Sequence, residues 1–177
     1  MKEWSSDRWV GVLAILASLG TLFVIVYQTN LYRKQQYASV LPYLEVWNSR
    51  NDDSYRLILI NNGIGPAFIE EVKVIYQDSV YALDPAEFAQ EVIIPIDSIT
   101  RWGYSNISKG RLVPAGTQIE LIQVTNDSLN ASKMWSWFSG ADPNRKEIPE
   151  IEFVYGSVYG EKWMVQKYGT DIPKKLE

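Results

Sequence analysis

The feature that most constrains this chain is an uncharged, mostly apolar run near its N-terminus. From Trp9 to Tyr32 there are 24 consecutive residues without Asp, Glu, Lys or Arg, and Val10–Val26 is almost wholly apolar. A helix rises about 1.5 Å per residue, so about 20 residues cross the hydrocarbon core of a bilayer. The run therefore predicts a single transmembrane helix. A buried core helix is the alternative, but a single globular domain rarely covers such a helix on every side.

The residues that flank the run are of the kinds that prefer the membrane interface. Trp9 lies at one end, Tyr27 and Tyr32 lie at the other, and Arg33 and Lys34 follow at once. We expect all five side chains at the level of the lipid headgroups. A cleavable signal peptide is the competing interpretation. The N-terminal flank has mixed charge, however, and no small-residue cleavage site follows the run, so the sequence predicts an uncleaved anchor.

The charged flanks give conflicting indications of membrane orientation. Counting cations alone places the N-terminus inside, whereas counting net charge makes the C-terminal flank the cytoplasmic one. The tail of residues 1–8 has a charge near zero and is easy to translocate. The balance favours a single-pass protein of the cell's inner membrane, with its soluble part on the cytoplasmic side.

Small side chains recur along the apolar run at a spacing of four residues. Ala14 is followed by Ser18, and Ala17 is followed by Thr21, so each pair lies on one strip of a helix. Such pairs let two membrane helices approach closely. The pattern therefore predicts helix packing with a second copy of the chain or with another protein. The absence of charge within the run argues against an ion or proton path through this helix.

After the run, the residue pattern changes from helical to extended. Helix-forming residues continue to about Ser39, and Pro42 ends the helix. From Leu41 onward apolar residues alternate with polar ones, which predicts strands with one face on a core. The chain thus divides into a tail (1–8), a transmembrane and juxtamembrane helix (9–40) and a mainly β domain (41–177) that we expect to be an Ig-like β-sandwich. Strands are predicted at 43–48, 55–60, 71–76, 80–83, 100–106, 117–125, 150–155 and 162–168, and a short helix at 84–90.

A second helix is predicted late in the β domain. Asn126 or Asp127 can cap a helix from Ser128 to about Phe138, and Gly140 can end it. Trp137 falls roughly opposite the face that we expect to pack on the sheet. Because exposed tryptophans are enriched at interaction hot spots, Trp137 is a candidate partner contact. The packing face is expected to carry Leu129, Ala131, Met134, Trp135 and Phe138.

One loop carries a resemblance to a known group of proteins. The segment 61–67, NNGIGPA, resembles the N-x-G-x-G-P-A hairpin of small bacterial membrane-anchored proteins of unassigned function. Those proteins also have an N-terminal helix and a basic, Gln-containing juxtamembrane segment that ends near a proline, here 33–44. The late hairpin 155–163 fits the same pattern. The resemblance implies a fold and a topology, and it supplies no catalytic residues.

The residues of this loop also have a physical interpretation of their own. Asn62 followed by Gly63 can take the positive φ that a tight turn needs. Gly65 before Pro66 favours an extended exit. The two glycines are not a nucleotide fingerprint, because a strand pattern follows them where a phosphate site would need a helix N-terminus. We therefore expect Asn62, Gly63, Gly65 and Pro66 to form a structural turn.

The composition narrows the chemistry that the chain can perform. It has no histidine and no cysteine, which removes the commonest general base, thiol catalysis, disulfides and thiolate metal sites. A Ser–Lys hydrolase remains open on composition alone. Carboxylates are the other acid–base groups, and we expect their pairs to be solvated, with no cofactor and no metal. The pairs are Asp52 with Asp53, Glu70 with Glu71, and Glu150 with Glu152.

The charge balance and the lack of chemistry together favour a binding role. Outside the helix and its flanks, 13 basic residues face 19 acidic ones, so a nucleic-acid backbone would be repelled. We therefore expect a non-enzymatic, membrane-anchored interaction or assembly module that binds another protein or a second copy of itself. The alternative is a small-molecule-gated membrane effector of a bacterial defence system. A closed, aromatic-lined pocket with convergent polar groups would favour that alternative.

Overall fold

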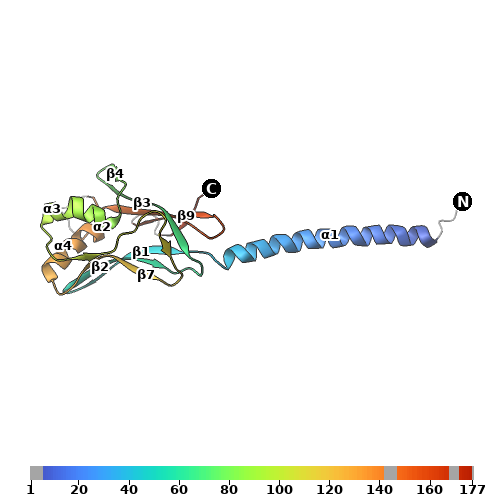
Figure 1. Ribbon diagram of the computed structural model, residues 1–177, viewed down its shortest axis with the longest axis horizontal. Helices are drawn as coiled ribbons and strands as arrows, with labels where there is room; N and C mark the ends of the chain where they lie inside the picture. The colour runs from blue at the N-terminus through green and yellow to red at the C-terminus, as the bar shows by residue number, and fades with distance from the viewer. Residues whose placement is uncertain (1–5, 142–146, 168–171, 177) are drawn as a thin grey trace. The chain divides into compact units, whose positions relative to one another are not determined.

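The computed structural model describes residues 6–141, 147–167 and 172–176, and the chain divides into two compact units, Met1–Ser39 and Val40–Glu177. The first unit is helix α1 (Ser6–Ala38), which ends just before Pro42, as expected (Figure 1). Its residues from Trp9 to Ala38 form one helix that is long and apolar enough to cross a membrane, and none of its most apolar stretch is buried. The hydroxyls of Ser18 and Thr21 donate to carbonyls one turn earlier, at 2.8 and 2.9 Å. Both groups are therefore satisfied inside the helix.

The second unit is mainly β, as predicted, and holds two antiparallel sheets. One sheet has the strand order β1-β2-β7-β5, and the other has the order β10-β9-β8-β3-β4, with β6 also paired to β3 (Figure 1). The first sheet contains β1 (Leu44–Asn51), β2 (Ser54–Asn61), β7 (Gln118–Val124) and β5 (Gly103–Tyr104). The second contains β3 (Ala67–Tyr76), β4 (Ser79–Tyr81), β6 (Leu112–Val113), β8 (Glu150–Gly156), β9 (Lys162–Lys167) and β10 (Lys174–Lys175).

A single apolar core lies between the two sheets. Tyr55, Leu57 and Leu59 of β2 are fully buried, as are Phe153 and Tyr155 of β8, so the core-facing sides predicted by alternation are confirmed on both strands. Ile58 and Glu152, which alternation placed on the opposite faces, are buried as well. A bulge in β7 disturbs that alternation. Its extra residue shifts the register against β2, and two successive side chains of β7 both enter the core.

Three short helical segments join β4 to β5. They are α2 (Pro85–Phe88), a π-helical turn η1 (Ala89–Ile93) and α3 (Ile94–Asp97), which together run further than the predicted helix at 84–90. Asp84 caps α2 and accepts hydrogen bonds from the N–H groups of Ala86 and Glu87, both at 2.8 Å. Pro95 lies in the first turn of α3, where a missing N–H is tolerated, so the helical path continues past it.

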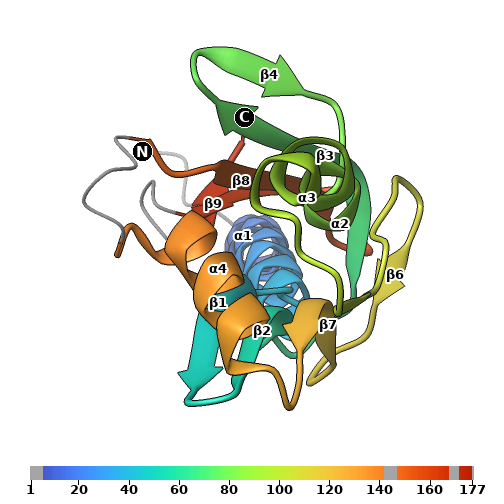
Figure 2. The same ribbon diagram turned by 90° about the vertical axis from the view of Figure 1, so that its left-hand side faces the viewer.

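Helix α4 (Ser128–Ser139) confirms the second predicted helix but corrects its orientation. Asp127 is its N-cap, and Gly140 ends it with a φ of 70°. Trp137, the candidate partner contact, is fully buried, whereas Leu129 is 67% exposed. The buried face follows the helical spacing through Ala131, Met134, Trp137 and Phe138, so three residues of the expected face are confirmed, whereas Trp135 is only half-buried. Figure 2 shows α4 and the α2–α3 segment together at one end of the sheets.

Several strand boundaries differ from the prediction. The strand expected at 100–106 is reduced to the two residues of β5, and β6 and β10, also two residues each, were not predicted. Tyr168, at the end of a predicted strand, lies outside the described residues.

The free edge of β1 is closed by two side chains from the other sheet. The N–H of Leu44 donates to the Tyr155 hydroxyl at 3.3 Å, and the Lys167 ammonium donates to the Val46 carbonyl at 3.2 Å. Edge strands expose unpaired backbone groups and are commonly protected by such side chains. The two sheets are thereby joined along this side of the domain.

The buried hydroxyl of Tyr155 predicts a loss of stability at high pH. Burial raises the pKa of Tyr155 to about 12, whereas an exposed tyrosine titrates near 10. Below pH 10 the Tyr155 side chain is neutral in both the folded and the unfolded state. Between pH 10 and 12 it ionises only in the unfolded chain, so the free energy of unfolding should fall by about 2 to 3 kcal/mol. We expect Tyr155→Phe to cost about 1 kcal/mol at pH 8 and to show a shallower alkaline decline in urea unfolding. An identical decline in both proteins would contradict this assignment.

Candidate functional site

The predicted structural turn, the loop 61–67, holds the segment through which the chain enters the β domain. Asn61 is fully buried, and its amide makes four hydrogen bonds. Its oxygen accepts from the N–H groups of Tyr43 and Gly63, and its nitrogen donates to the carbonyls of Gly65 and Val113, all within 3.1 Å. A buried amide with every position satisfied fixes the surrounding backbone in one arrangement.

Backbone hydrogen bonds also join the loop 61–67 to the entry segment. Asn62 N–H donates to the Tyr43 carbonyl at 2.8 Å, and the N–H groups of Ile64 and Gly65 both donate to the Leu41 carbonyl. We call the loop 61–67 together with the entry segment 40–43 the linker clasp. The clasp joins two stretches that are about twenty residues apart in the sequence.

The glycines of the clasp have a different role from the one expected. Neither Asn62 nor Gly63 has a positive φ, so the backbone conformation expected for this pair is wrong. A Cβ atom on Gly63 would instead collide with backbone atoms of Leu41, Pro42 and Tyr43. A Cβ on Gly65 would collide with Val40. Glycine is present here because the two backbones approach too closely for any side chain.

Of the carboxylates that form pairs in the sequence, three take part in ion pairs among the described residues, and Glu71 and Glu152 share Lys73. Glu152 is buried, contrary to the expected solvated face, and accepts from Lys73 at 2.6 Å. The hydrogen bond to Glu152 raises the pKa of Lys73 above its ordinary value. Glu70 pairs with Lys162. Asp52 and Asp53 form an exposed turn between β1 and β2, and among the described residues no group of three acidic side chains is placed to hold a metal ion.

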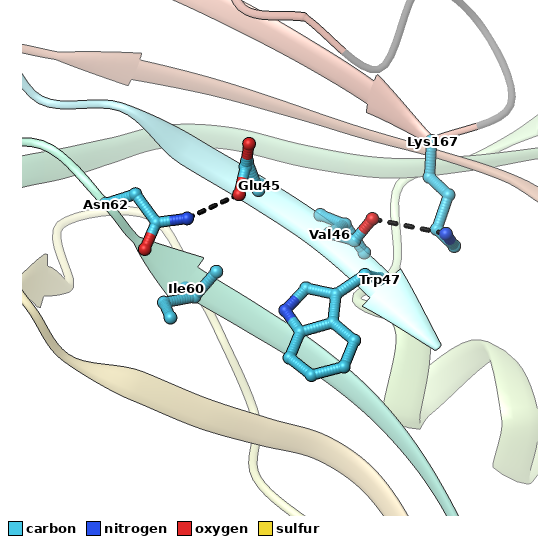
Figure 3. A pocket seen from close by; sticks show the side chains of 6 residues that line it. All are labelled: Glu45, Val46, Trp47, Ile60, Asn62 and Lys167. Atoms are coloured by element: carbon cyan, nitrogen blue, oxygen red, sulfur yellow. Dashed lines mark hydrogen bonds between the residues drawn. The ribbon is translucent and has the colours of Figure 1, made fainter. Parts of the chain in front are cut away.

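The best candidate for a binding site is a groove on the outer side of β1 and β2. It has a volume of about 530 Å³ and is open to solvent. Trp47 lies opposite Ile58 in the strand pairing, and Glu45 lies opposite Ile60. The indole of Trp47 remains 42% exposed, whereas Ile58 is buried. The groove is lined by Glu45, Val46, Trp47, Ile60, Asn62 and Lys167 (Figure 3).

The groove has an apolar floor between two charged ends. Figure 3 shows Trp47 and Ile60 side by side, with Glu45 directed to Asn62 and Lys167 directed to the Val46 carbonyl. The described residues offer Glu45 the Asn62 amide as a hydrogen-bond donor but no cation within ion-pair distance. The carboxylate can attract a cation by its charge, and the exposed indole can bind the same cation over the face of its ring.

The exposed tryptophan of the β domain is Trp47 and not Trp137, the partner contact predicted from the sequence, and the pattern of β1 contains a signal for it. Leu44 and Val46 point to the core, so alternation places Trp47 on the outer face of the same strand. An outward tryptophan in an otherwise alternating strand is the clearer sign of a contact surface. No model of a known protein family matches this chain, and no curated protein matches its sequence.

Proposed function

We propose that the protein is a non-enzymatic interaction module in which α1 spans the membrane once and anchors an Ig-like β-sandwich. The exposed tryptophan of the β1–β2 groove carries the proposal. Trp47 offers a large rigid surface on the outer face of a sheet, beside a carboxylate and above an apolar floor. Such aromatic side chains supply much of the binding energy at protein interfaces. The net charge of the two flanks supports placing the sandwich on the cytoplasmic side.

The occupant that best fits the groove is a polypeptide that presents a basic side chain. The basic group would lie over the Trp47 indole and pair with Glu45, while neighbouring apolar atoms cover Ile60. Each of these contacts is modest in water, at about 0.5 to 1 kcal/mol for an exposed cation–π contact. Together with burial of the indole they provide a compact recognition site. Attachment to the membrane would confine the search for the partner to the bilayer surface.

In-membrane photo-crosslinking tests this proposal. A photoreactive phenylalanine replaces Ser49, which follows Trp47 on the same face of β1, in the full chain in native membranes. We expect a discrete adduct with a protein, and at least a tenfold loss of that adduct when Trp47→Ala is added. Leu129→Ala is the matched control, because Leu129 is exposed on α4, away from the groove. It should leave the adduct unchanged.

Two results would count against the proposal. One is the absence of any adduct from position 49. The other is an adduct whose yield is the same with and without the indole. Circular dichroism of each variant in detergent should show the same β signal, so that loss of the adduct reports on the surface and not on unfolding.

A further inference from the structure

A second feature of the domain is an unpaired stretch of strand edge. β5 pairs with only part of β7, through Gly103 opposite Gln123 and Tyr104 opposite Ile122. One further bond joins Ser105 N–H to the Leu121 carbonyl at 3.2 Å. The chain then leaves β7, so the first three residues of β7 have a partner strand on the β2 side only.

Asp84 is the reason why the chain leaves β7. One of its carboxylate oxygens caps α2, and the other accepts from Asn106 Nδ2 at 2.9 Å and from the Ile107 N–H at 3.0 Å. Asp84 is buried, so these bonds hold residues 106 and 107 firmly against the start of α2. A β5 strand that continued along β7 would have to break them.

The direction of the free backbone groups follows from the register. Asn62 N–H donates to Tyr43 on the β1 side, and Asn61 N–H donates to Thr117 on the β7 side. Backbone groups alternate in direction along a strand. The N–H and C=O groups of Gln118 and Glu120 therefore point away from β2, and the described residues provide no hydrogen-bond partner for them.

An open groove of about 520 Å³ runs beside these groups. Leu112 forms part of its wall and is 46% exposed. Arg111 also lines it; its guanidinium donates to the Asn106 carbonyl and has no carboxylate partner among the described residues. Glu120 is already paired with Arg56 at 3.3 Å. The groove thus combines free strand-pairing groups, an apolar wall and one uncompensated positive charge.

We infer that this edge of β7 binds an extended segment of a partner polypeptide, which adds to the sheet as a strand and places an acidic side chain near Arg111. Backbone hydrogen bonds supply the affinity in this mode, and the side-chain contacts supply the specificity. The exposed edge of β1 is closed by Tyr155 and Lys167, whereas this one is open. The edge is recessed beside residues 105–114, which suits a single extended segment better than the edge of a second folded copy.

The inference shares with the proposed function the idea of a polypeptide partner, but it concerns a different surface. Its test therefore uses the full chain carrying Trp47→Ala, solubilised in detergent, so that the β1–β2 groove is already disabled. The probe is a phage-displayed library of linear ten-residue peptides. We expect recovered peptides to carry an acidic residue within an alternating apolar pattern. Failure to recover any binding peptide would overturn the inference and would leave the Trp47 crosslinking result untouched.

The best recovered peptide is then measured against two substitutions at one position. Gln118→Pro removes an N–H that points into the groove but leaves the hydrogen bonds between β2 and β7 intact. The Kd of the peptide for this variant should therefore rise at least tenfold. Gln118→Ala keeps that N–H, so its Kd should change less than twofold. Hydrogen exchange of the Glu120 amide provides a measurement that does not depend on the proline variant, and bound peptide should slow it at least tenfold. Equal binding by both variants, or unchanged exchange at Glu120, would overturn the inference; crosslinked dimers that compete with the peptide would assign the edge to a second copy.

Discussion

Gly65→Ala is expected to destabilise the β domain by about 3 kcal/mol or more, or to prevent its folding. A Cβ atom on Gly65 would overlap the Val40 carbonyl, and even the Val40 Cα would be only 2.8 Å away. All three nearest atoms belong to the backbone, which cannot rotate aside as a side chain can. Overpacking a tight site typically costs 1 to 3 kcal/mol, and here the linker clasp would also lose hydrogen bonds to Leu41 and Asn61.

Gly63→Ala should behave in the same way, because its Cβ would meet the backbone of residues 41–43. Two other glycines provide matched controls. The three atoms nearest to a Cβ on Gly103, from 3.0 Å, all belong to the side chain of Gln123, which can move aside, so Gly103→Ala should cost little. Gly116 has open space around it but a φ of 70°, so Gly116→Ala should cost about 1 kcal/mol through backbone strain alone.

Urea unfolding of the full chain in detergent, followed by tryptophan fluorescence, measures all four variants. The order of stability should be Gly103→Ala, then Gly116→Ala, then the two clasp variants. If Gly65→Ala proved as stable as Gly103→Ala, the close approach between residues 40 and 65 would be wrong. A positive φ at Gly63 would let asparagine replace it, whereas the close backbone approach predicts that Gly63→Asn is at least as unstable as Gly63→Ala.

The glycines of the clasp show why part of the structure could not be read from the sequence. The local pattern NNGIGPA identifies a break between two strands, and a bent loop is present there between β2 and β3. What makes glycine necessary is the backbone of residues 40–43, which becomes a neighbour only when the domain folds. Local patterns report local conformation, whereas a contact between distant segments depends on the whole fold.

The strand faces and the position of Trp137 show the same difference between what a local pattern determines and what the whole fold determines. Alternation along β2 and β8 was enough to predict which side of each strand enters the core, because a period of two leaves little choice. On α4 the predicted core face was right for Ala131, Met134 and Phe138 but left out Trp137, which lies on the same buried side. Its indole N–H in fact donates to Asp97, and its ring lies 5.7 Å from that of Tyr76. Neither contact could be inferred from residues 126–140 alone.

The open edge of β7 results from contacts between segments that are far apart in the sequence. The sequence predicted a strand at 100–106, and its residues do have strand-forming character. The buried Asp84 withdraws Asn106 and Ile107 from the sheet, so the strand ends at Tyr104. A single buried carboxylate thus decides whether β7 is covered, and its position was not visible from the strand pattern.

Alkaline carbonate extraction of the full chain tests the central claim, that one helix anchors the β domain in a membrane. The protein carries an N-terminal epitope tag, so that recovery of the tag also excludes cleavage of α1. Tagged, full-length protein should remain in the membrane pellet. Leu16→Arg together with Leu19→Arg places two charges in the middle of the apolar stretch, at about 2.5 to 3.5 kcal/mol each, and should release most of the protein into the supernatant. Leu129→Arg, on the exposed side of α4, is the matched control and should stay in the pellet. Recovery of the unmodified protein in the supernatant, or loss of the tag from the pelleted protein, would contradict the account.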